Sequence, residues 1–229
     1  MPSSALSTLL ARAERDDNVV GLVVHGSRGR GLHVTEQSDL DVILVVRELR
    51  GEYPGGHGDP VDVAEVTSIE RLPEWMLPAV TWAEPALDKT GEVAEQLKRA
   101  TAVDPATAAE PLDGYINMYY RSAKNARVGL ELASLLDAQE SIPWYLQFVF
   151  NVQARIRPYN KWLEWELREH PLPTSCNVQL SLLERIARTG DVGAQQQLFR
   201  DVERVAREHG HGDVVDGWEP DVAWLRGGV

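Results

Sequence analysis

Two apolar runs on either side of a polar loop constrain this chain more than any other feature. Val19–Val24 is a nearly unbroken apolar run, and Val42–Val46 is a second. Such runs are typical of strands buried on both faces of a sheet, because a strand with one solvated face alternates apolar with polar residues. The loop begins with a Gly-Ser turn and ends with Asp39 and Asp41. The pattern therefore predicts two core strands, with two carboxylates at the mouth of the second.

These two carboxylates lie at positions i and i+2. Side chains alternate across a strand, so we expect Asp39 and Asp41 to point to the same side. Two like charges side by side repel unless a cation lies between them. Carboxylate oxygens suit Mg²⁺, which usually takes one or two protein carboxylates and completes its shell with phosphates and water. Gly26 and Ser27 supply a turn at which the backbone can approach a phosphate closely.

Taken together, these residues resemble the signature of the nucleotidyltransferases of the DNA polymerase β superfamily. The signature is an apolar strand, Gly-Ser or Gly-Gly, an intervening stretch and then Asp-apolar-Asp. This chain reads His25-Gly26-Ser27, residues 28–38, and Asp39-Leu40-Asp41. The family usually adds a third carboxylate on the next strand, and Asp62 offers one in the stretch 61–66. The resemblance covers roughly residues 19–66, under a third of the chain.

The resemblance implies a particular chemistry. In this family divalent metals, here two Mg²⁺ ions, hold a nucleoside triphosphate while an acceptor hydroxyl attacks the α-phosphorus and pyrophosphate leaves. Asp39, Asp41 and Asp62 would be the catalytic residues and the metal ligands, and Asp62 is the first candidate for the general base. We expect the triphosphate to be ATP. The alternative is that the aspartates are ordinary turn and strand-start residues, because Asp-x-Asp at strand entry also arises by chance.

A triphosphate also needs donors and cations along its length, because nucleotidyl transfer depends mostly on positioning and charge stabilisation. Gly26 and Ser27 are the expected phosphate-binding turn, and Arg28 lies beside it. In the second half of the chain, Arg121 and Lys124 lie at i and i+3 and share one helix face. Related enzymes present such groups to the triphosphate from a helix after the catalytic domain. Solvated charged side chains are the alternative for all three cations.

Charge and composition exclude several other classes of protein. The net charge of −12 argues against a sequence-independent nucleic-acid binder and is compatible with a small cationic substrate. Cys176 is the only cysteine, so no intrachain disulfide can form. No apolar run approaches the roughly 18 residues needed to span a membrane, and a signal-peptide layout is lacking. We therefore expect a cytoplasmic protein that acts on small molecules and binds neither nucleic acid nor membrane.

The predicted fold class is α+β. We expect a nucleotidyltransferase domain over residues 1–108, with a mixed sheet flanked by helices. A helical bundle over residues 109–229 would then close the cleft for nucleotide and acceptor. The boundary is placed in residues 101–111, which are rich in Ala, Thr, Asp and Pro.

Within the bundle, apolar residues spaced by three and four predict one long helix from Ile116 to near Asp137. Ser141 and Pro143 are expected to start another helix, since proline is favoured in a first helical turn. The Gly-rich tail, residues 210–229, is expected to be irregular.

The layout of two such domains resembles the aminoglycoside and lincosamide nucleotidyltransferases. An antibiotic of the aminoglycoside type is therefore the first expectation for the acceptor. Two alternatives stay open: an antitoxin-like enzyme that modifies a protein partner, and a non-enzymatic nucleotide-binding protein on the same fold. Trp162 and Trp165 recur at helical spacing and either line an acceptor pocket or belong to the core.

Overall fold

The computed structural model describes residues 4–35, 38–53 and 61–227. The chain divides into two compact units, Met1–Ala102 and Val103–Val229. This division falls a few residues before the boundary expected at residue 108 and inside the stretch 101–111, which is rich in Ala, Thr, Asp and Pro. Because each unit has its own core, each is described by itself.

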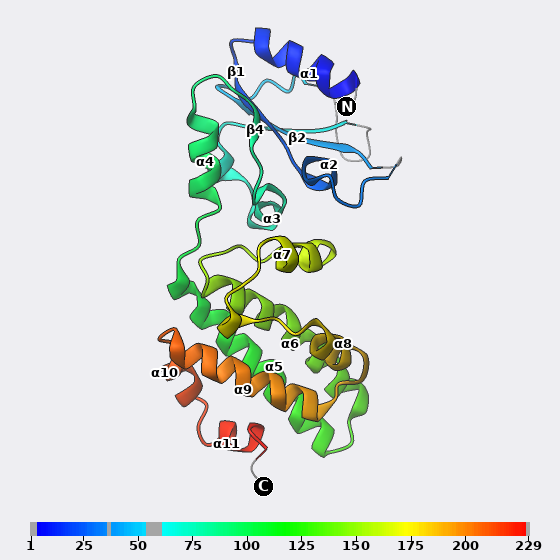
Figure 1. Ribbon diagram of the computed structural model, residues 1–229, viewed down its shortest axis with the longest axis vertical. Coiled ribbons are helices and arrows are strands. Elements are labelled where there is room, and N and C mark those ends of the chain that lie inside the picture. Colours follow the sequence, from blue (N-terminus) through cyan, green and yellow to red (C-terminus); the bar gives the residue numbers. More distant parts are fainter. Residues whose placement is uncertain (1–3, 36–37, 54–60, 228–229) are drawn as a thin grey trace. The chain divides into compact units, whose positions relative to one another are not determined.

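The N-terminal unit is built on a four-stranded mixed sheet (Figure 1). Its strands are β1 (Val19–Val24), β2 (Leu40–Val46), β3 (Val61–Val66) and β4 (Pro85–Asp88). Their order across the sheet is β3-β2-β1-β4. β1 runs antiparallel to both of its neighbours, whereas β2 and β3 are parallel. The expected mixed sheet is therefore present, and the two apolar runs form its two central strands.

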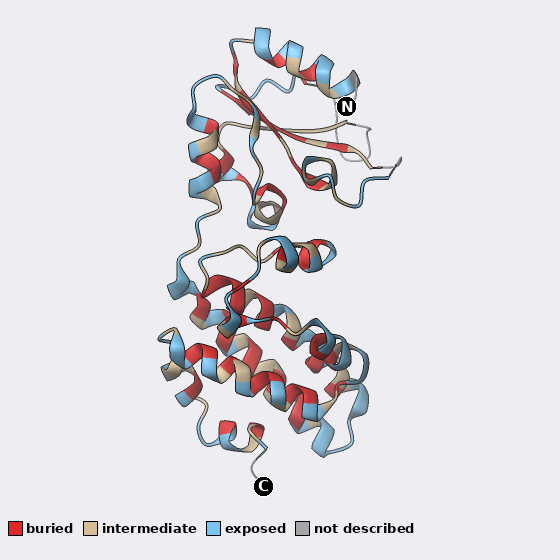
Figure 2. Ribbon diagram, in the orientation of Figure 1, coloured by how far each residue is buried: buried red, intermediate tan, exposed pale blue. Residues whose placement is uncertain are grey.

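Helices cover both faces of this sheet. They are α1 (Ser4–Arg15), α2 (Gly26–Arg30), α3 (Leu77–Val80) and α4 (Glu92–Ala100), with short 3₁₀ turns at Ile69–Arg71 and Glu74–Met76. On one face, α1 packs Leu9 and Ala13 against alternate residues of β1 and β2. On the other, α3, α4 and the first 3₁₀ turn pack against the intervening residues of the same strands. The central strands are red along most of their length in Figure 2, as expected for strands buried on both faces.

The strand β4 was missed by the sequence analysis. It is four residues long, begins at Pro85 and forms the edge of the sheet beside β1. Proline lacks the N–H that an interior strand position needs, and so it is confined to edge strands and strand starts. A short stretch that opens with proline carries almost no strand signal, which explains the omission.

The C-terminal unit consists of helices around one apolar core. They are α5 (Ala109–Arg127), α6 (Glu131–Asn151), α7 (Leu163–Glu169), α8 (Leu180–Thr189), α9 (Val192–Glu208), α10 (Gly212–Asp216) and α11 (Asp221–Leu225). Short 3₁₀ turns lie at Pro105–Ala108, Asn160–Trp162 and Thr174–Cys176. Tyr115, Tyr119, Phe148 and Phe199 form the centre of the core, and the buried sides of α5, α6 and α9 are seen in Figure 2. Among the described helices, none has both the length and the apolar character to cross a bilayer.

The prediction of one helix from Ile116 to near Asp137 was wrong. α5 ends at Arg127, and α6 begins at Glu131. Gly129 adopts a left-handed conformation with φ of 75°. The N–H of Leu130 then bonds to the Asn125 carbonyl, and the N–H of Gly129 bonds to the Ala126 carbonyl. This is the Schellman arrangement that ends helices at glycine. The apolar spacing continues across the break because α5 and α6 bury adjoining faces in the same core.

Two further expectations for this unit were wrong. Ser141 and Pro143 do not start a helix, because α6 runs through both. A proline within a helix removes one main-chain hydrogen bond and crowds the preceding turn, but the burial of α6 against α5 outweighs this cost. The tail is not irregular either, since α10 and α11 lie within it and bury Val215, Val222 and Leu225.

Candidate active site

The strand register brings two of the three expected carboxylates together. Asp41 of β2 and Asp62 of β3 are direct partners in the parallel ladder. The residues on either side of each, such as Val42 and Val63, pack in the core under α1. Because side chains alternate along a strand, Asp41 and Asp62 both point to the opposite face. Two carboxylates thus lie side by side on neighbouring strands.

A glycine makes room for one of these carboxylates. Gly26 begins α2 directly after β1 and has φ of 67°, a conformation that L side chains rarely adopt. A Cβ atom at this position would overlap the Asp41 carboxylate, with Oδ2 as the nearest atom. Only glycine therefore permits the carboxylate and the turn to lie in contact. The Gly-Ser turn and the Asp-x-Asp stretch, which are separate in the sequence, form one site.

Asp39 lies two residues before Asp41 and outside the regular strand. Its main chain is held by Arg28, whose Nε donates to the carbonyls of Ser38 and Asp39 at 2.9 and 3.0 Å. Nη2 of Arg28 adds a second bond to the Ser38 carbonyl, at 2.6 Å. The structure therefore gives Arg28 a role that the sequence analysis did not foresee, which is to fix the approach to β2. Its predicted contact with phosphate stays a prediction.

His25 is a buried residue of this site that the sequence analysis did not assign to any function. It continues β1 in extended conformation and is only 9% exposed. Burial lowers the pKa of its imidazole to about 4, although the charge of Asp39 acts in the opposite direction. The ring is therefore neutral at pH 7. Its Nδ1 atom has no hydrogen-bond partner among the residues that the structure describes. The only sequence signal was the position of His25 directly before Gly-Ser. The preceding residues of the run are apolar, so a further apolar residue would be expected there.

Glu65 lies on the other face of the sheet, as its spacing of three from Asp62 predicts. It pairs with Leu44, a core residue on the side of α1. Its carboxylate accepts main-chain N–H groups of Arg50, Gly51 and Tyr53 at 3.0 to 3.3 Å. Glu65 therefore holds the loop after β2. It lies on the opposite face of the sheet from Asp41 and Asp62, which are called the acidic pair below.

The carboxylates of this site meet part of what Mg²⁺ requires. Asp41 and Asp62 supply hard oxygens at adjacent positions, and Gly26 lets the backbone approach them. Across residues 4–35, 38–53 and 61–227, however, no three Asp, Glu, His or Cys side chains are already grouped closely enough to hold a metal ion. Mg²⁺ seldom occupies an all-protein cage and usually combines one or two carboxylates with substrate phosphates. The residues therefore fit a magnesium ion that binds together with its substrate.

Comparison with known proteins agrees with this geometry. Residues 6–99 match the family model of the nucleotidyltransferase domain. The N-terminal unit is a nucleotidyltransferase domain. The resemblance to polymerase β-type nucleotidyltransferases is thereby confirmed, as is the prediction of a nucleotidyltransferase enzyme. The match spans α1 to nearly the end of α4 and so includes β1, β2, β3 and the acidic pair.

Comparisons were also made over the whole length of the chain, with curated proteins and with solved structures. No curated protein matches it. A solved structure, described as a nucleotidyltransferase-like protein from Exiguobacterium sibiricum 255-15, is similar over 93% of this chain and 77% of its own. Sequence identity with that protein is 8%, and the TM-score is 0.45.

The helical unit that follows the nucleotidyltransferase domain contains the two other predicted nucleotide-binding residues. Arg121 forms an ion pair with Asp137 at 3.2 Å, and Asn125 donates to the same carboxylate at 2.8 Å. The ammonium of Lys124 lies 5.8 Å from the centre of the Tyr120 ring. Lys124 and Arg121 are both exposed on α5. Arg121 thus has a structural partner within its own unit, and its contact with nucleotide, like that of Lys124, stays a prediction.

Tryptophans that could have lined an acceptor pocket belong partly to the core. Trp162 is 1% exposed and is one of the largest fully buried side chains of the helical unit. Trp165 is only partly buried and meets the His170 ring edge-on at 5.4 Å. Nearby, the buried Glu166 carboxylate accepts a hydrogen bond from Arg155. Trp162 is therefore a core residue, and Glu166 is already neutralised within its own unit.

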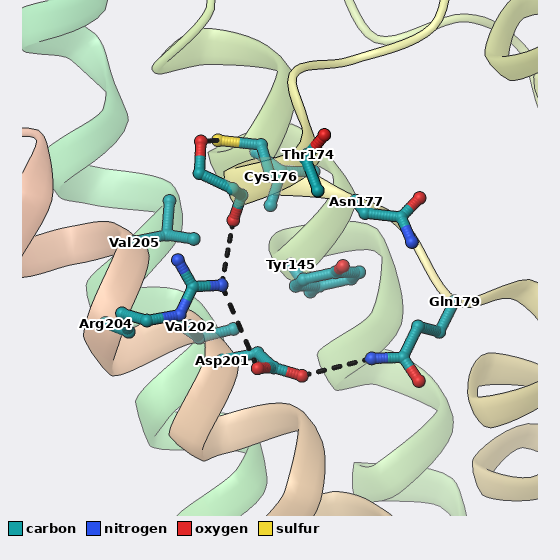
Figure 3. A pocket seen from close by; sticks show the side chains of 11 residues that line it. Tyr145, Thr174, Cys176, Asn177, Gln179, Asp201, Val202, Arg204 and Val205 are labelled. Atoms are coloured by element: carbon teal, nitrogen blue, oxygen red, sulfur yellow. Dashed lines mark hydrogen bonds and ion pairs between the residues drawn. The ribbon is translucent and has the colours of Figure 1, made fainter.

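The helical unit also contains a small polar pocket of about 160 Å³ between α6, α9 and the turn at Thr174–Cys176 (Figure 3). Tyr145 lies at its floor, and Asp201 and Arg204 lie at its edge. Asp201 accepts a hydrogen bond from Gln179 at 3.1 Å, and Arg204 donates to the Ser175 carbonyl at 2.9 Å. Asp201 and Arg204 are therefore held by groups of the pocket itself.

Proposed function

We propose that the protein transfers a nucleoside monophosphate, AMP from ATP, to a hydroxyl group of a small molecule and releases pyrophosphate. The nucleotidyltransferase domain supports the type of transfer, and the pairing of Asp41 with Asp62 supports its place in the molecule. The choice of ATP, of Mg²⁺ and of the acceptor rests on the resemblance to small-molecule nucleotidyltransferases.

Asp39, Asp41 and Asp62 would hold the magnesium ions through their carboxylate oxygens. The metal, when bound, neutralises charge on the triphosphate and on the transferred group. The side-by-side arrangement of Asp41 and Asp62 is the single observation that carries this assignment, because two adjacent carboxylates supply the hard oxygen ligands that Mg²⁺ takes from proteins.

The residues of the chain divide the remaining work between them. Gly26 allows the backbone of the turn to approach the phosphates, and Arg28 fixes the main chain that leads to Asp39. The acceptor oxygen forms a bond to the α-phosphorus while the bond from that phosphorus to the β-bridging oxygen breaks. The proton of the acceptor hydroxyl passes to Asp62, and pyrophosphate leaves with the electron pair of the broken bond.

A cationic hydroxylated acceptor fits the charge of the chain. The net charge of −12 favours the approach of small cations over that of anions. Aminoglycoside-type antibiotics carry both amines and hydroxyls and are therefore the first class to test. The helical unit would close over acceptor and nucleotide, with Arg121 and Lys124 toward the triphosphate.

The test is incubation of the purified protein with Mg²⁺, each of the four labelled NTPs in turn and a panel of hydroxylated amines. We expect pyrophosphate and a labelled small-molecule adduct with ATP, and neither product with the Asp41→Asn variant. Label appearing on a protein band would instead favour the antitoxin-like alternative. Triphosphate binding without pyrophosphate release under any condition would favour a non-enzymatic nucleotide-binding protein.

A further inference from the structure

The acidic pair is part of a longer row of side chains. His25 directly follows β1, and its main-chain N–H donates to the Asp41 carbonyl at 3.0 Å. The antiparallel pairing of Val24 with Val42 continues in this way to His25 and Asp41. Since residues opposite each other on paired strands share a face, His25, Asp41 and Asp62 lie side by side across three strands.

The imidazole in this row is not explained by packing alone. It is nine-tenths buried, and within the described part of the chain its Nδ1 atom bonds to nothing. A buried polar atom without a partner costs free energy, whereas a phenyl ring in the same space would not. A partner that reaches Nδ1 in another state of the site would offset this cost.

Asp39 is the most suitable partner. Asp39 lies two residues before Asp41, the residue opposite His25, so it is the diagonal neighbour of His25 across the two chain segments. Its charge also acts on the His25 ring. Arg28 holds the main chain of Asp39 in place, so rotation of the Asp39 side chain is enough to change its contacts.

We infer that His25 is a positioning residue for Asp39, and that its Nδ1–H donates a hydrogen bond to the Asp39 carboxylate when a divalent ion is bound. The inference rests on the proposed function, because it takes Asp39 as a metal ligand. Carboxylates that bind metals are usually hydrogen-bonded by a second group, and loss of that group typically lowers metal affinity about 10–100-fold. His25 would therefore set the affinity of the site without touching the metal.

The experiment compares Mn²⁺ binding, followed by electron paramagnetic resonance in the presence of ATP, with the melting temperature of each variant. His25→Phe keeps a ring but removes both nitrogens, whereas His25→Asn places an amide near the position of Nδ1. We expect Mn²⁺ affinity to fall about 10–100-fold in His25→Phe and to recover in part in His25→Asn. The melting temperature of His25→Phe should not fall. His170→Asn, a histidine change in the other unit, should leave Mn²⁺ affinity as in the parent protein.

Unchanged Mn²⁺ affinity in His25→Phe would overturn the inference. So would an equal loss in His25→Phe and His25→Asn accompanied by lower melting temperatures, because that pattern marks a structural role. Asp41→Asn distinguishes a failure of the proposed metal site from a failure of the role given to His25. If it binds Mn²⁺ as well as the parent protein does, the proposed metal site itself is wrong. If it binds poorly while His25→Phe binds normally, only the role of His25 is refuted.

Discussion

The candidate site of the N-terminal unit and the buried acids of the helical unit have different surroundings. In the N-terminal unit, Asp41 and Asp62 are brought together by the strand register, like charge beside like charge. In the helical unit, buried or half-buried acids are matched with bases. Glu166 pairs with Arg155, Asp137 with Arg121, and Glu203 with both Arg207 and Arg226.

This difference distinguishes a candidate ligand site, around Asp41 and Asp62, from a structural scaffold, the matched ion pairs of the helical unit. Matched ion pairs stabilise their own surroundings and need no further partner, so they give no reason to expect a ligand. Adjacent carboxylates offer hard oxygen ligands to a divalent cation and so give a reason to expect one. We therefore place the proposed chemistry in the N-terminal unit and expect substitutions in the two units to have different kinds of effect.

The largest expected effects come from substitutions of Asp41 and Asp62. Asp62→Asn should bind the Mg-triphosphate complex almost normally but turn over about 10²–10⁴-fold more slowly, because the amide cannot accept the acceptor's proton. Asp41→Asn should lose both binding and turnover. The measurements are triphosphate affinity by calorimetry and single-turnover rate. If Asp62→Asn loses binding as badly as Asp41→Asn does, Asp62 acts first as a metal ligand. If it keeps nearly full turnover, the base lies elsewhere.

The contact between Gly26 and Asp41 can be broken with a matched control. Gly26→Ala adds both backbone strain, about 1–2 kcal/mol, and a clash with the Asp41 carboxylate. Gly31→Ala has nearly the same positive φ but nothing within 4 Å of the added carbon, so it reports the strain alone. We expect Gly26→Ala to lose more stability in denaturant unfolding than Gly31→Ala and to lose turnover as well. Equal effects of the two variants would contradict the close packing of turn and carboxylate.

Lys124→Ala tests whether the helical unit contributes to the site. If Lys124 contacts the triphosphate, its removal should weaken ATP binding by about 1–3 kcal/mol, the range for a lost charge-assisted contact. Lys98→Ala removes the same charge from an exposed pair on α4 and should leave ATP affinity nearly unchanged. Calorimetry that finds no difference between the two variants would return Lys124 to a solvated helix face.

The smallest expected effect concerns the matched pairs of the helical unit. Hydrogen bonds from Arg226 and Arg207 lower the pKa of Glu203 below its usual value of 4.5. The ionised carboxylate therefore stabilises the fold above pH 4.5, and this contribution is lost as the pH falls through the lowered value.

Glu203→Gln should accordingly destabilise the protein by about 1 kcal/mol at pH 7, and the difference from the parent should shrink in acid. Glu184→Gln breaks an exposed pair with Arg188 and should cost at most about 0.5 kcal/mol. Both variants should retain turnover. A loss of turnover in Glu203→Gln, with no change in the melting temperature, would contradict a purely structural role for Glu203.

Much of the N-terminal unit could be predicted because its signals are local. Two apolar runs identified β1 and β2, and Asp41 was assigned from its place at the strand mouth. The edge strand β4 escaped because Pro85 opens it. The structural features that could be predicted were those determined by a few residues that are neighbours in the sequence.

The position of His25 and the course of α5 and α6 could not be read in this way. His25 belongs to the site through its pairing with Asp41 across β1 and β2, and a single sequence does not reveal strand register. The break at Gly129 and the passage of α6 through Pro143 depend on which helix faces meet in the core. Tertiary packing overrode the local preference of proline, and glycine ended a helix whose apolar spacing continued.

The most direct test of the central claim is ATP binding and turnover with the divalent metal removed and then restored. Calorimetry and pyrophosphate release would be measured on the parent protein in excess EDTA, and again after addition of excess Mg²⁺. We predict that binding and turnover are both lost in EDTA and both return with Mg²⁺, because the proposed role of Asp41 and Asp62 is to hold the cation that binds the triphosphate. Full turnover in excess EDTA would contradict the assignment of Asp41 and Asp62 to a metal site.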